Sequence, residues 1–242
     1  MIFMKKNFIL LFISFLFAHI NTTFAITCSN GSYYDSFDDY QETTINDPLI
    51  LLNKYMFTFN MIIDAMVLEP ASRTYTAIIP AAGRKHVSSV FQNINTPLSV
   101  VSHSLMGDFK SASRSFVRFL VNSTLGFGGM MDVAKDFGLR HKKATFTSVL
   151  EKWKIPDGPY IMLPILGPSN LTSAIATIGE LTVYPTTKFY KKHPTIPALQ
   201  IVNERAKMRD VFDKIKKSID PYTNTKSQYI QYRCKNKQLS YE

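Results

Sequence analysis

The sequence has few of the residues on which metal and redox sites are built. Its 242 residues include two cysteines, Cys28 and Cys234, one tryptophan and five histidines. The cysteines are far apart and the histidines are scattered, without the close spacing that zinc ligands show in sequence. We therefore expect no metal site.

Nucleotide-binding loops are also missing. The stretch NSTLGFGGMMDVA, residues 122–134, has three glycines in four positions. A dinucleotide-binding loop needs G-x-G-x-x-G after a strand, and a P-loop ends in Gly-Lys-Ser or Gly-Lys-Thr. No lysine follows Gly129, and the residues upstream carry apolar side chains at helical spacing. We therefore expect no nucleotide and no other cofactor.

The sequence lacks the common signatures of hydrolases. It has no G-x-S-x-G elbow, no H-E-x-x-H and no acidic cluster outside residues 29–45. His103 lies between Ser102 and Ser104, but adjacency in sequence does not make a catalytic triad. We expect no catalytic residues and no enzyme; a periplasmic hydrolase that uses His103 is a competing hypothesis.

Acidic residues are the minority among the charged ones. The chain has 18 Asp and Glu against 28 Lys and Arg, a formal net charge of +10. This excess favours an anionic partner, such as nucleic acid, an acidic protein face or a membrane. Residues 1–25 have a basic start, a short apolar run and small residues before Ala25, which is the pattern of an export signal. Because an exported protein rarely meets nucleic acid, we expect a membrane and no nucleic acid.

Cys28 follows the signal and has two possible fates. In an oxidising compartment it could form a disulfide with Cys234 that closes nearly the whole chain. Alternatively, cleavage just before Cys28 could make it the lipid-modified first residue of a bacterial lipoprotein. The preceding residues Ala25, Ile26 and Thr27 depart from the usual lipoprotein signal. The sequence leaves both alternatives open.

After a polar lead-in at residues 26–45, the chain predicts helices separated by prolines. Asp47 and Pro48 are expected to cap and open the first helix, and Pro70 to end it. A further break is expected at residues 95–97, where Asn-Thr-Pro occurs.

The first of these helices is apolar on most sides. Polar residues interrupt it at intervals, which disfavours a full transmembrane span and favours a buried or membrane-surface helix. These interrupting residues are Asn53, Lys54, Asn60 and Asp64.

A helix predicted after Asp108, its expected cap, has two faces. One face is apolar and suits a protein core or lipid. The other is basic and suits phosphates, or is simply solvated. The apolar face carries Phe109, Ala112, Phe116 and Leu120, and the basic face carries Lys110, Arg114 and Arg118.

Prolines and glycines dominate the stretch TSVLEKWKIPDGPYIMLPILGPSNL, residues 147–171. They predict an extended, rigid loop whose apolar side chains contact the core, lipid or a partner. We expect a helix over residues 171–183, a last helix over about 198–218, and a basic tail at 233–242.

Three motifs in this order resemble the MlaA family, also called VacJ: NDPLILLNKYMFTFN, NSTLGFGGMMDVA and DGPYIMLPILGPSNL. The similarity covers residues 46–232. One departure is that charged Glu151, Lys152 and Lys154 flank Trp153, where family members commonly have glycines. The motif residues that carry the resemblance are Asn46, Asp47, Pro48, Asn53, Asn60, Asn122, Gly158, Pro159, Tyr160, Pro164 and Gly167.

The resemblance implies a mainly α, single ring-like, membrane-embedded domain with a central amphipathic channel and Pro/Gly-rich loops. It places the protein at the periplasmic face of the bacterial outer membrane, in the inner leaflet, with trimeric porins. The implied function is removal of misplaced phospholipids from the outer leaflet to the periplasmic carrier MlaC, which maintains lipid asymmetry. A structural porin-associated envelope protein without transport activity is the alternative.

Within this picture we assign site residues to three groups. Gly126, Gly128, Gly129 and Asp132 are candidates for a channel wall or hinge, although a plain turn between helices explains the glycines equally well. Candidates for lipid headgroup contacts are Lys110, Arg114 and Arg118, and Cys28 is the possible lipidation site.

Overall fold

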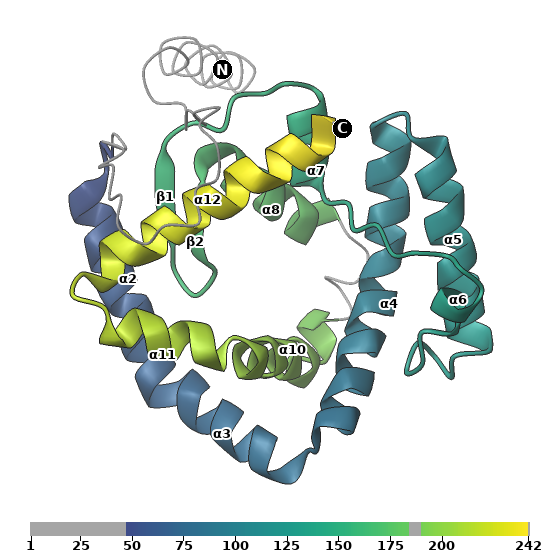
Figure 1. Ribbon diagram of the computed structural model, residues 1–242, viewed down its shortest axis with the longest axis horizontal. Helices are drawn as coiled ribbons and strands as arrows, with labels where there is room; N and C mark the ends of the chain where they lie inside the picture. The colour runs from purple at the N-terminus through teal and green to yellow at the C-terminus, as the bar shows by residue number, and fades with distance from the viewer. Residues whose placement is uncertain (1–46, 184–189, 242) are drawn as a thin grey trace, which may run out of the picture.

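The computed structural model describes residues 47–183 and 190–241, which form a ring of helices with one short β-hairpin (Figure 1). The expectation of a mainly α, ring-like fold is confirmed. In chain order the elements are α2 (Ile50–Ile63), η1 (a π-helical turn, Asp64–Leu68), α3 (Glu69–Ile78), α4 (Ala81–Leu105), α5 (Phe109–Thr124), α6 (Val133–Asp136), α7 (Phe146–Lys152), β1 (Tyr160–Leu163), β2 (Gly167–Asn170), α8 (Leu171–Val183), α10 (Thr195–Lys207), α11 (Arg209–Lys217) and α12 (Pro221–Tyr241).

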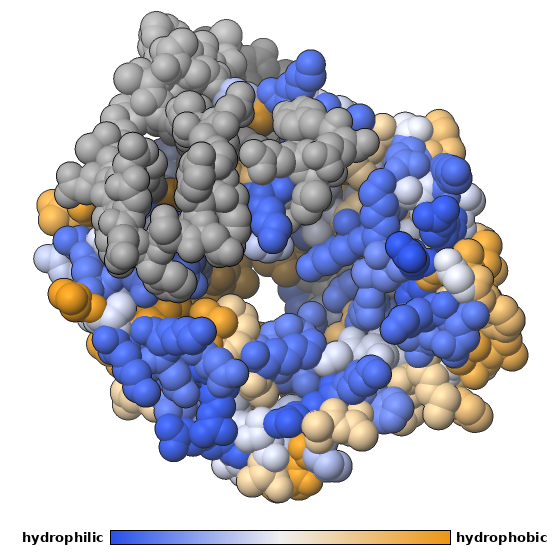
Figure 2. Space-filling view, in the orientation of Figure 1, coloured by the Kyte–Doolittle hydropathy of each residue, from blue (hydrophilic) through white to orange (hydrophobic). Residues whose placement is uncertain are grey.

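The elements surround a central opening. In Figure 1, α4, α8, α10 and the hairpin border it, whereas α3 lies on the outside of the ring and α5 and α6 lie on the outer side of α4. In the space-filling view the opening passes through the middle of the molecule, so side chains do not fill it (Figure 2).

The first helical segment runs from Ile50 to Ile78 without a break, so the expected end at Pro70 was wrong. The π-helical turn η1 explains the difference, because Glu69 N–H donates to the carbonyl of Asp64, five residues back. Pro70 lies in the first turn of α3, directly after this wider turn. The helix can therefore continue although proline has no N–H to donate. We call the continuous segment Ile50–Ile78 the rod.

The expected break at residues 95–97 was also wrong, since α4 continues through Pro97. A proline inside a helix removes one backbone hydrogen bond, and contacts with a neighbouring helix can compensate for that loss. Here α5 packs along α4, with Asn93 Nδ2 donating to Ser123 Oγ at 2.9 Å. Thr96 Oγ1 also donates to the carbonyl of Gln92 at 2.9 Å.

Asp47 does not cap the first helix, contrary to the expectation. The N-cap of α2 is Leu49, which makes no side-chain cap. The carboxylate of Asp47 instead accepts hydrogen bonds from Asn53 Nδ2 (2.8 Å), the hydroxyl of Tyr222 and Lys226 Nζ (3.2 Å). Asp47 therefore ties the start of the rod to α12. Asp108, by contrast, caps α5 as expected, accepting from Ser111 N–H at 3.0 Å.

The later part of the chain matches the expectations in part. Helix α8 covers Leu171–Val183, as predicted, and the proline-rich stretch before it contains α7 and the β1–β2 hairpin as well as loop. The single helix expected over 198–218 is two helices, α10 and α11, that meet at Met208. The expected tail at 233–242 is largely the end of α12, which the sequence did not predict.

Many polar side chains are buried and many large apolar ones are exposed, which is unusual for a water-soluble protein. Among the described residues, 20 polar or charged residues are buried, against 12 apolar ones. On α5 the buried positions are small or polar, such as Ser111, Ser115 and Asn122. The large apolar side chains of the rod and α5 are exposed instead, among them Leu51, Tyr55, Met66, Phe109, Phe116 and Leu120. These side chains form an apolar belt that requires lipid or a partner to cover it.

A buried ion pair joins the rod to the far end of the chain. Arg205 Nη2 lies 3.1 Å from Asp64 Oδ2, and the side chains of both residues are at most 4% exposed. Lys216 Nζ reaches the same carboxylate at 3.1 Å, and the Arg205 guanidinium lies 4.0 Å from the ring centroid of Phe212. Because each charge is paired, the attraction between the partners offsets the cost of their desolvation, and the pair fixes η1 against the α10–α11 region.

We predict that Asp64→Asn lowers the free energy of unfolding by about 3 kcal/mol, because Arg205 keeps a buried charge without its main counter-charge. Thermal unfolding of the purified protein in detergent, followed by circular dichroism, measures the change. The matched control is Glu204→Gln, which removes an exposed ion pair with Lys207 and should cost no more than about 1 kcal/mol. Equal unfolding temperatures for the two variants would contradict the prediction.

Candidate functional site

The first and third family motifs meet at the β-hairpin. Strand β1 pairs with β2 in antiparallel register, with Tyr160 opposite Asn170 and Leu163 opposite Gly167. Its other edge faces α2, where Asn53 is fully buried. Asn53 Oδ1 accepts from Met162 N–H at 2.8 Å, and its Nδ2 donates to the carbonyl of Tyr160 at 3.1 Å. The side-chain amide thus makes the two bonds that a neighbouring strand would make.

Asn60 repeats this arrangement two helical turns further along α2. Its Oδ1 accepts from Ile165 N–H at 2.7 Å, and its Nδ2 donates to the carbonyl of Leu163 at 2.8 Å. Together, Asn53 and Asn60 satisfy the free edge of β1 and fix the hairpin against the rod. Seven helical residues and three strand residues both span about 10 Å. The spacing of these two motif asparagines therefore matches two bonded pairs of backbone groups that lie three residues apart on the strand edge.

An aromatic cluster covers the base of the hairpin. Tyr160 lies edge-on to Tyr222 and Tyr229, with ring centroids 6.4 and 5.8 Å apart. Burial raises the pKa of all three hydroxyls, that of Tyr229 to about 12. The three tyrosines therefore stay neutral at physiological pH and serve packing and hydrogen bonding.

The glycine and proline positions of the third motif shape the hairpin. Gly158 has φ +69°, and a Cβ there would lie 3.0 Å from Leu171 Cβ. The carbonyl of Pro159 accepts from Leu171 N–H at 3.1 Å, and Gly167 begins β2 with φ +82°. Pro48 lies in the turn before α2, and Asn46 is outside the described residues.

The second motif forms a separate anchor around Asn122. Its Oδ1 accepts from Ala134 N–H and its Nδ2 donates to Asp132 Oδ1, both at 2.9 Å. Arg118 donates to the same Asp132 oxygen at 2.7 Å and to the carbonyl of Leu139. Burial alone would raise the pKa of Asp132, but the bonds from Asn122 and Arg118 prevail and lower it. Asp132 is therefore the ionised centre of this anchor.

The glycines of this motif form a tight turn that folds back on α4. A Cβ on Gly126 would lie 2.4 Å from the carbonyl oxygen of Met131, and one on Gly129 would lie 2.5 Å from Asn93 Cβ. Gly128 has φ +70° and open space around it. The turn leads from α5 to α6 on the outer side of α4 (Figure 1), so it does not border the opening. A hinge role for these glycines and Asp132 stays a prediction.

The three predicted headgroup contacts lie in different environments. Lys110 is exposed and Arg114 is half-buried, but the side chain of Arg118 is 3% exposed and already paired. Arg118 is therefore an anchor of the turn, and its assignment as a headgroup contact was wrong. The helical spacing placed it beside Lys110 and Arg114 but could not show that α6 covers that end of the face.

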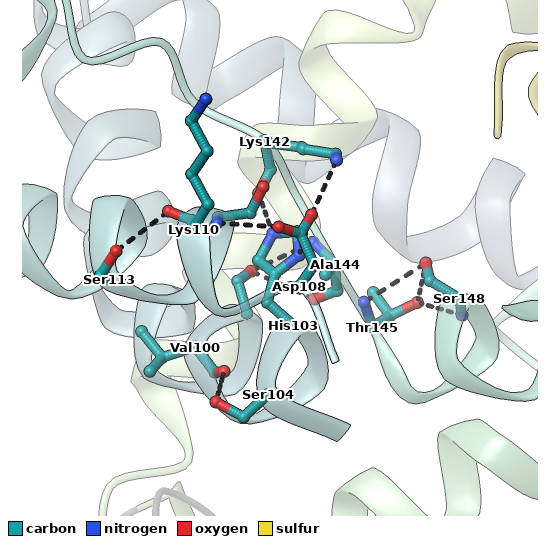
Figure 3. A network of polar contacts seen from close by, with 12 residues as sticks. Val100, His103, Ser104, Asp108, Lys110, Ser113, Lys142, Ala144, Thr145 and Ser148 are labelled. Carbon is teal, nitrogen blue, oxygen red and sulfur yellow. Dashed lines mark hydrogen bonds and ion pairs between the residues drawn. The ribbon is translucent and has the colours of Figure 1, made fainter. Parts of the chain in front are cut away.

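His103 is a structural residue rather than an exposed base (Figure 3). Its ring is 1% exposed, Nε2 donates to the carbonyl of Lys142 at 3.1 Å, and Nδ1 lies 3.9 Å from Asp108 Oδ2. Ser102 is fully buried and Ser104 bonds a backbone carbonyl within its own helix. This arrangement gives no support to a hydrolase. Across residues 47–183 and 190–241, no group of three or more His, Cys, Asp or Glu could hold a metal.

A polar cluster on α12 was missed by the sequence analysis. Arg233 Nη2 lies 2.7 Å from Asp157 Oδ1, and its Nη1 pairs with Glu151, so α12 is fixed to the segment before β1. The signal that could have found it is a stripe at helical spacing: Tyr222, Lys226, Tyr229 and Arg233. Tyr222 and Lys226 bind Asp47, and Arg233 binds Asp157.

Cys234, also on α12, is disulfide-bonded. The only other cysteine in the sequence is Cys28, which lies outside the described residues. A cysteine that carries lipid on its sulfur cannot also form a disulfide, so the two fates of Cys28 are chemically exclusive.

We predict that the mature protein, unfolded without reductant, takes up no maleimide, and that reduction adds two labels per chain. Mass spectrometry of the intact protein reads both numbers. A lipidated Cys28 would give the opposite pattern, with one label on Cys234 before reduction and no increase afterwards. Cys234→Ser should expose a free thiol on Cys28 if the disulfide exists.

We predict that Asn60→Leu loosens the hairpin, because it removes both bonds to the β1 edge at similar volume. The Ile165 amide should exchange with solvent about tenfold faster, as the loss of a hydrogen bond worth about 1.4 kcal/mol implies. Hydrogen exchange of the peptide that spans β1 measures this. Thr58→Val removes an exposed bond within α2 and should leave the exchange unchanged.

Comparison with known proteins identifies the relatives of this chain. Residues 45–236 match the family model described as MlaA lipoprotein. An uncharacterized protein of Rickettsia prowazekii is 33% identical over 190 residues, which cover 76% of this chain and 74% of that one. The Haemophilus influenzae protein named "Intermembrane phospholipid transport system lipoprotein MlaA" is 28% identical over 213 residues, with 84% and 82% coverage.

One solved structure shares the fold. It was reported as "Structural basis for maintenance of bacterial outer membrane lipid asymmetry", and it is 28% identical to this chain with a TM-score of 0.67. The match covers 78% of this chain and 98% of the other. The family-model match and these similarities agree with the paired asparagine and glycine motifs described above, and the chain belongs to the MlaA lipoprotein family.

Proposed function

We propose that this protein is the outer-membrane component of a phospholipid transport system that removes phospholipids from the outer leaflet. It lies in the inner leaflet, at the periplasmic face, and so maintains the lipid asymmetry of the outer membrane. The single observation that carries the proposal is a ring with a polar interior, an apolar belt and an open centre. The names of the relatives, which concern intermembrane phospholipid transport, support the same function.

The apolar belt supports a position within one leaflet. The rod has the length and composition of a membrane-crossing helix, at about 1.5 Å per residue for 29 residues. However, its polar side chains Asn53, Asn60 and Asp64 all point to one side and bind the rest of the ring. A helix fixed along one side and apolar on the other is suited to lie at a membrane interface.

The opening supplies a route for a polar headgroup. Moving a charged headgroup through hydrocarbon is unfavourable unless polar groups or water accompany it. Hydrophilic surface borders much of the opening in the view of Figure 2. A phospholipid can therefore pass its headgroup along the ring while its acyl chains stay in an apolar environment.

Lys110 and Arg114 are the proposed first contacts for the headgroup phosphate. Both lie on α5, the helix that also exposes Phe109 and Phe116 as part of the apolar belt. Cations beside exposed apolar side chains match the boundary between acyl chains and headgroups. A trimeric porin as neighbour in the membrane, and a soluble periplasmic carrier of the MlaC type as acceptor, complete the proposal.

The test is the amount of phospholipid accessible from outside the cell, measured with an added phospholipase. Deletion of the gene should raise this amount and the wild-type chain should restore it. Lys110→Gln with Arg114→Gln should restore it less well, because two phosphate contacts of up to about 1 kcal/mol each are lost. Lys207→Gln with Lys217→Gln, also exposed, is the matched control and should behave as wild type.

Two outcomes would change the proposal. If deletion leaves the accessible phospholipid unchanged while the protein is present in the outer membrane of wild-type cells, transport is wrong and a structural porin-associated protein is favoured. If deletion has the expected effect but the α5 double variant restores asymmetry fully at normal protein level, only the assignment of Lys110 and Arg114 falls.

A further inference from the structure

The tip of the β-hairpin has an unfavourable backbone conformation. Pro164, Ile165 and Leu166 form a three-residue turn, with Leu166 N–H donating to the carbonyl of Pro164 at 2.7 Å. Ile165 at its centre has φ +65°. A β-branched residue is rarely found at positive φ, because its side chain crowds the backbone. Turns of this kind are strained and persist only where the surroundings hold them.

The side chains at this tip receive no compensation from burial. Ile165 is 58% exposed and Leu166 is 61% exposed. A glycine would adopt the same conformation without strain, as the neighbouring Gly167 does at φ +82°. The chain therefore holds two large apolar side chains outward on a strained turn, and this arrangement favours a role in binding over a role in folding.

Asn60 is the residue that holds the tip in place. It bonds the backbone on both sides of Pro164, at the carbonyl of Leu163 and the N–H of Ile165. Since Asn60 belongs to the rod, the tip is fixed to the largest helical segment of the ring. The two apolar side chains are thus presented from a rigid support.

The tip lies on the inside of the ring rather than on the outer belt. In Figure 1 the β1–β2 turn reaches the border of the central opening. Figure 2 shows hydrophobic atoms at this border, next to hydrophilic surface. A molecule that passes through this opening can therefore contact the tip.

We propose that Ile165 and Leu166 bind the acyl chains of a glycerophospholipid as it passes through the ring. This inference rests on the proposed function and adds a binding site inside the opening. An acyl chain is slender, apolar and uncharged, which matches two exposed aliphatic side chains without a charged neighbour on the turn. The tip then gives the chains an apolar contact in a ring whose interior is otherwise rich in polar groups.

Photo-crosslinking tests the inference directly. The full-length protein is placed in vesicles of phosphatidylethanolamine and phosphatidylglycerol with a trace of a phospholipid that carries a diazirine at the end of one acyl chain. After illumination, labelled peptides are identified by mass spectrometry. We expect labelling of the peptide that contains residues 160–167, reduced about tenfold by Ile165→Gly with Leu166→Ser, since two apolar contacts are lost.

Three controls test whether the labelling is specific to the tip. Val211→Ser with Ile219→Ser changes exposed apolar residues of α11 and the segment after it, which belong neither to the apolar belt nor to the hairpin, and should leave labelling of the hairpin unchanged. Glycine fits the backbone at position 165, so the tip variant should keep the wild-type hydrogen exchange of β1 and β2. A headgroup-linked diazirine should label the hairpin less than the acyl-linked probe does.

The outcomes distinguish this inference from the proposed function. Absence of hairpin labelling by the acyl probe, or stronger labelling by the headgroup probe, overturns the inference even if deletion raises accessible phospholipid. If the acyl probe labels the hairpin and the tip variant abolishes this labelling, the inference is supported. This holds even if deletion has no effect on asymmetry, and in that case only the transport proposal is overturned.

Discussion

The structure depends on one stripe of acidic and amide side chains along the N-terminal rod. Asp47 binds Tyr222 and Lys226 of α12, and Asp64 binds Arg205 of α10 and Lys216 of α11. Between them, two asparagines bind both sides of the hairpin, as described above. Asp47 lies just before the rod, and the other three positions lie on one side of it. Together they hold the hairpin, α10, α11 and α12, and this closes the ring.

At the membrane position that we propose, polar contacts carry this role because apolar packing cannot. In a lipid environment, exposed apolar side chains gain nothing by moving inward, so burial of hydrocarbon does not determine which faces meet. A polar group in contact with lipid is costly, and pairing it with another polar group removes that cost. The apolar belt and the polar interior therefore both follow from the cost of placing polar groups in contact with lipid. This ring is held by polar contacts between its elements rather than by an apolar core at its centre. It can therefore keep an opening there.

Two further backbone features of the ring serve the same arrangement. The π-helical turn η1 places Asp64 at the point where the rod meets Arg205, and it accommodates the proline that follows. The turn after α5 uses Gly126 and Gly129 to bring the chain against Asn93, and the Arg118–Asp132 pair then fixes it. In both cases a carboxylate is paired with a buried arginine, so an ion pair fixes the local backbone conformation.

The amino-acid sequence by itself determined the class of protein and many local features. Helical spacing and caps predicted α8 and the start of α5 at Asp108, and three ordered motifs identified the family. The sequence could not determine which face of each helix points inward, because apolar residues suit a protein core and a lipid environment equally well. Arg118 shows the limit: its spacing placed it with Lys110 and Arg114, and only the packing of α5 against α6 showed that it is buried. Pro70 and Pro97 were misread for a related reason, since a proline ends a helix unless tertiary contacts hold it together. The contacts of Asn53 and Asn60 with the hairpin, and the ion pair of Asp64, join residues more than 100 positions apart. The strained tip at Ile165 depends on one of these contacts. Only the tertiary structure decided these features.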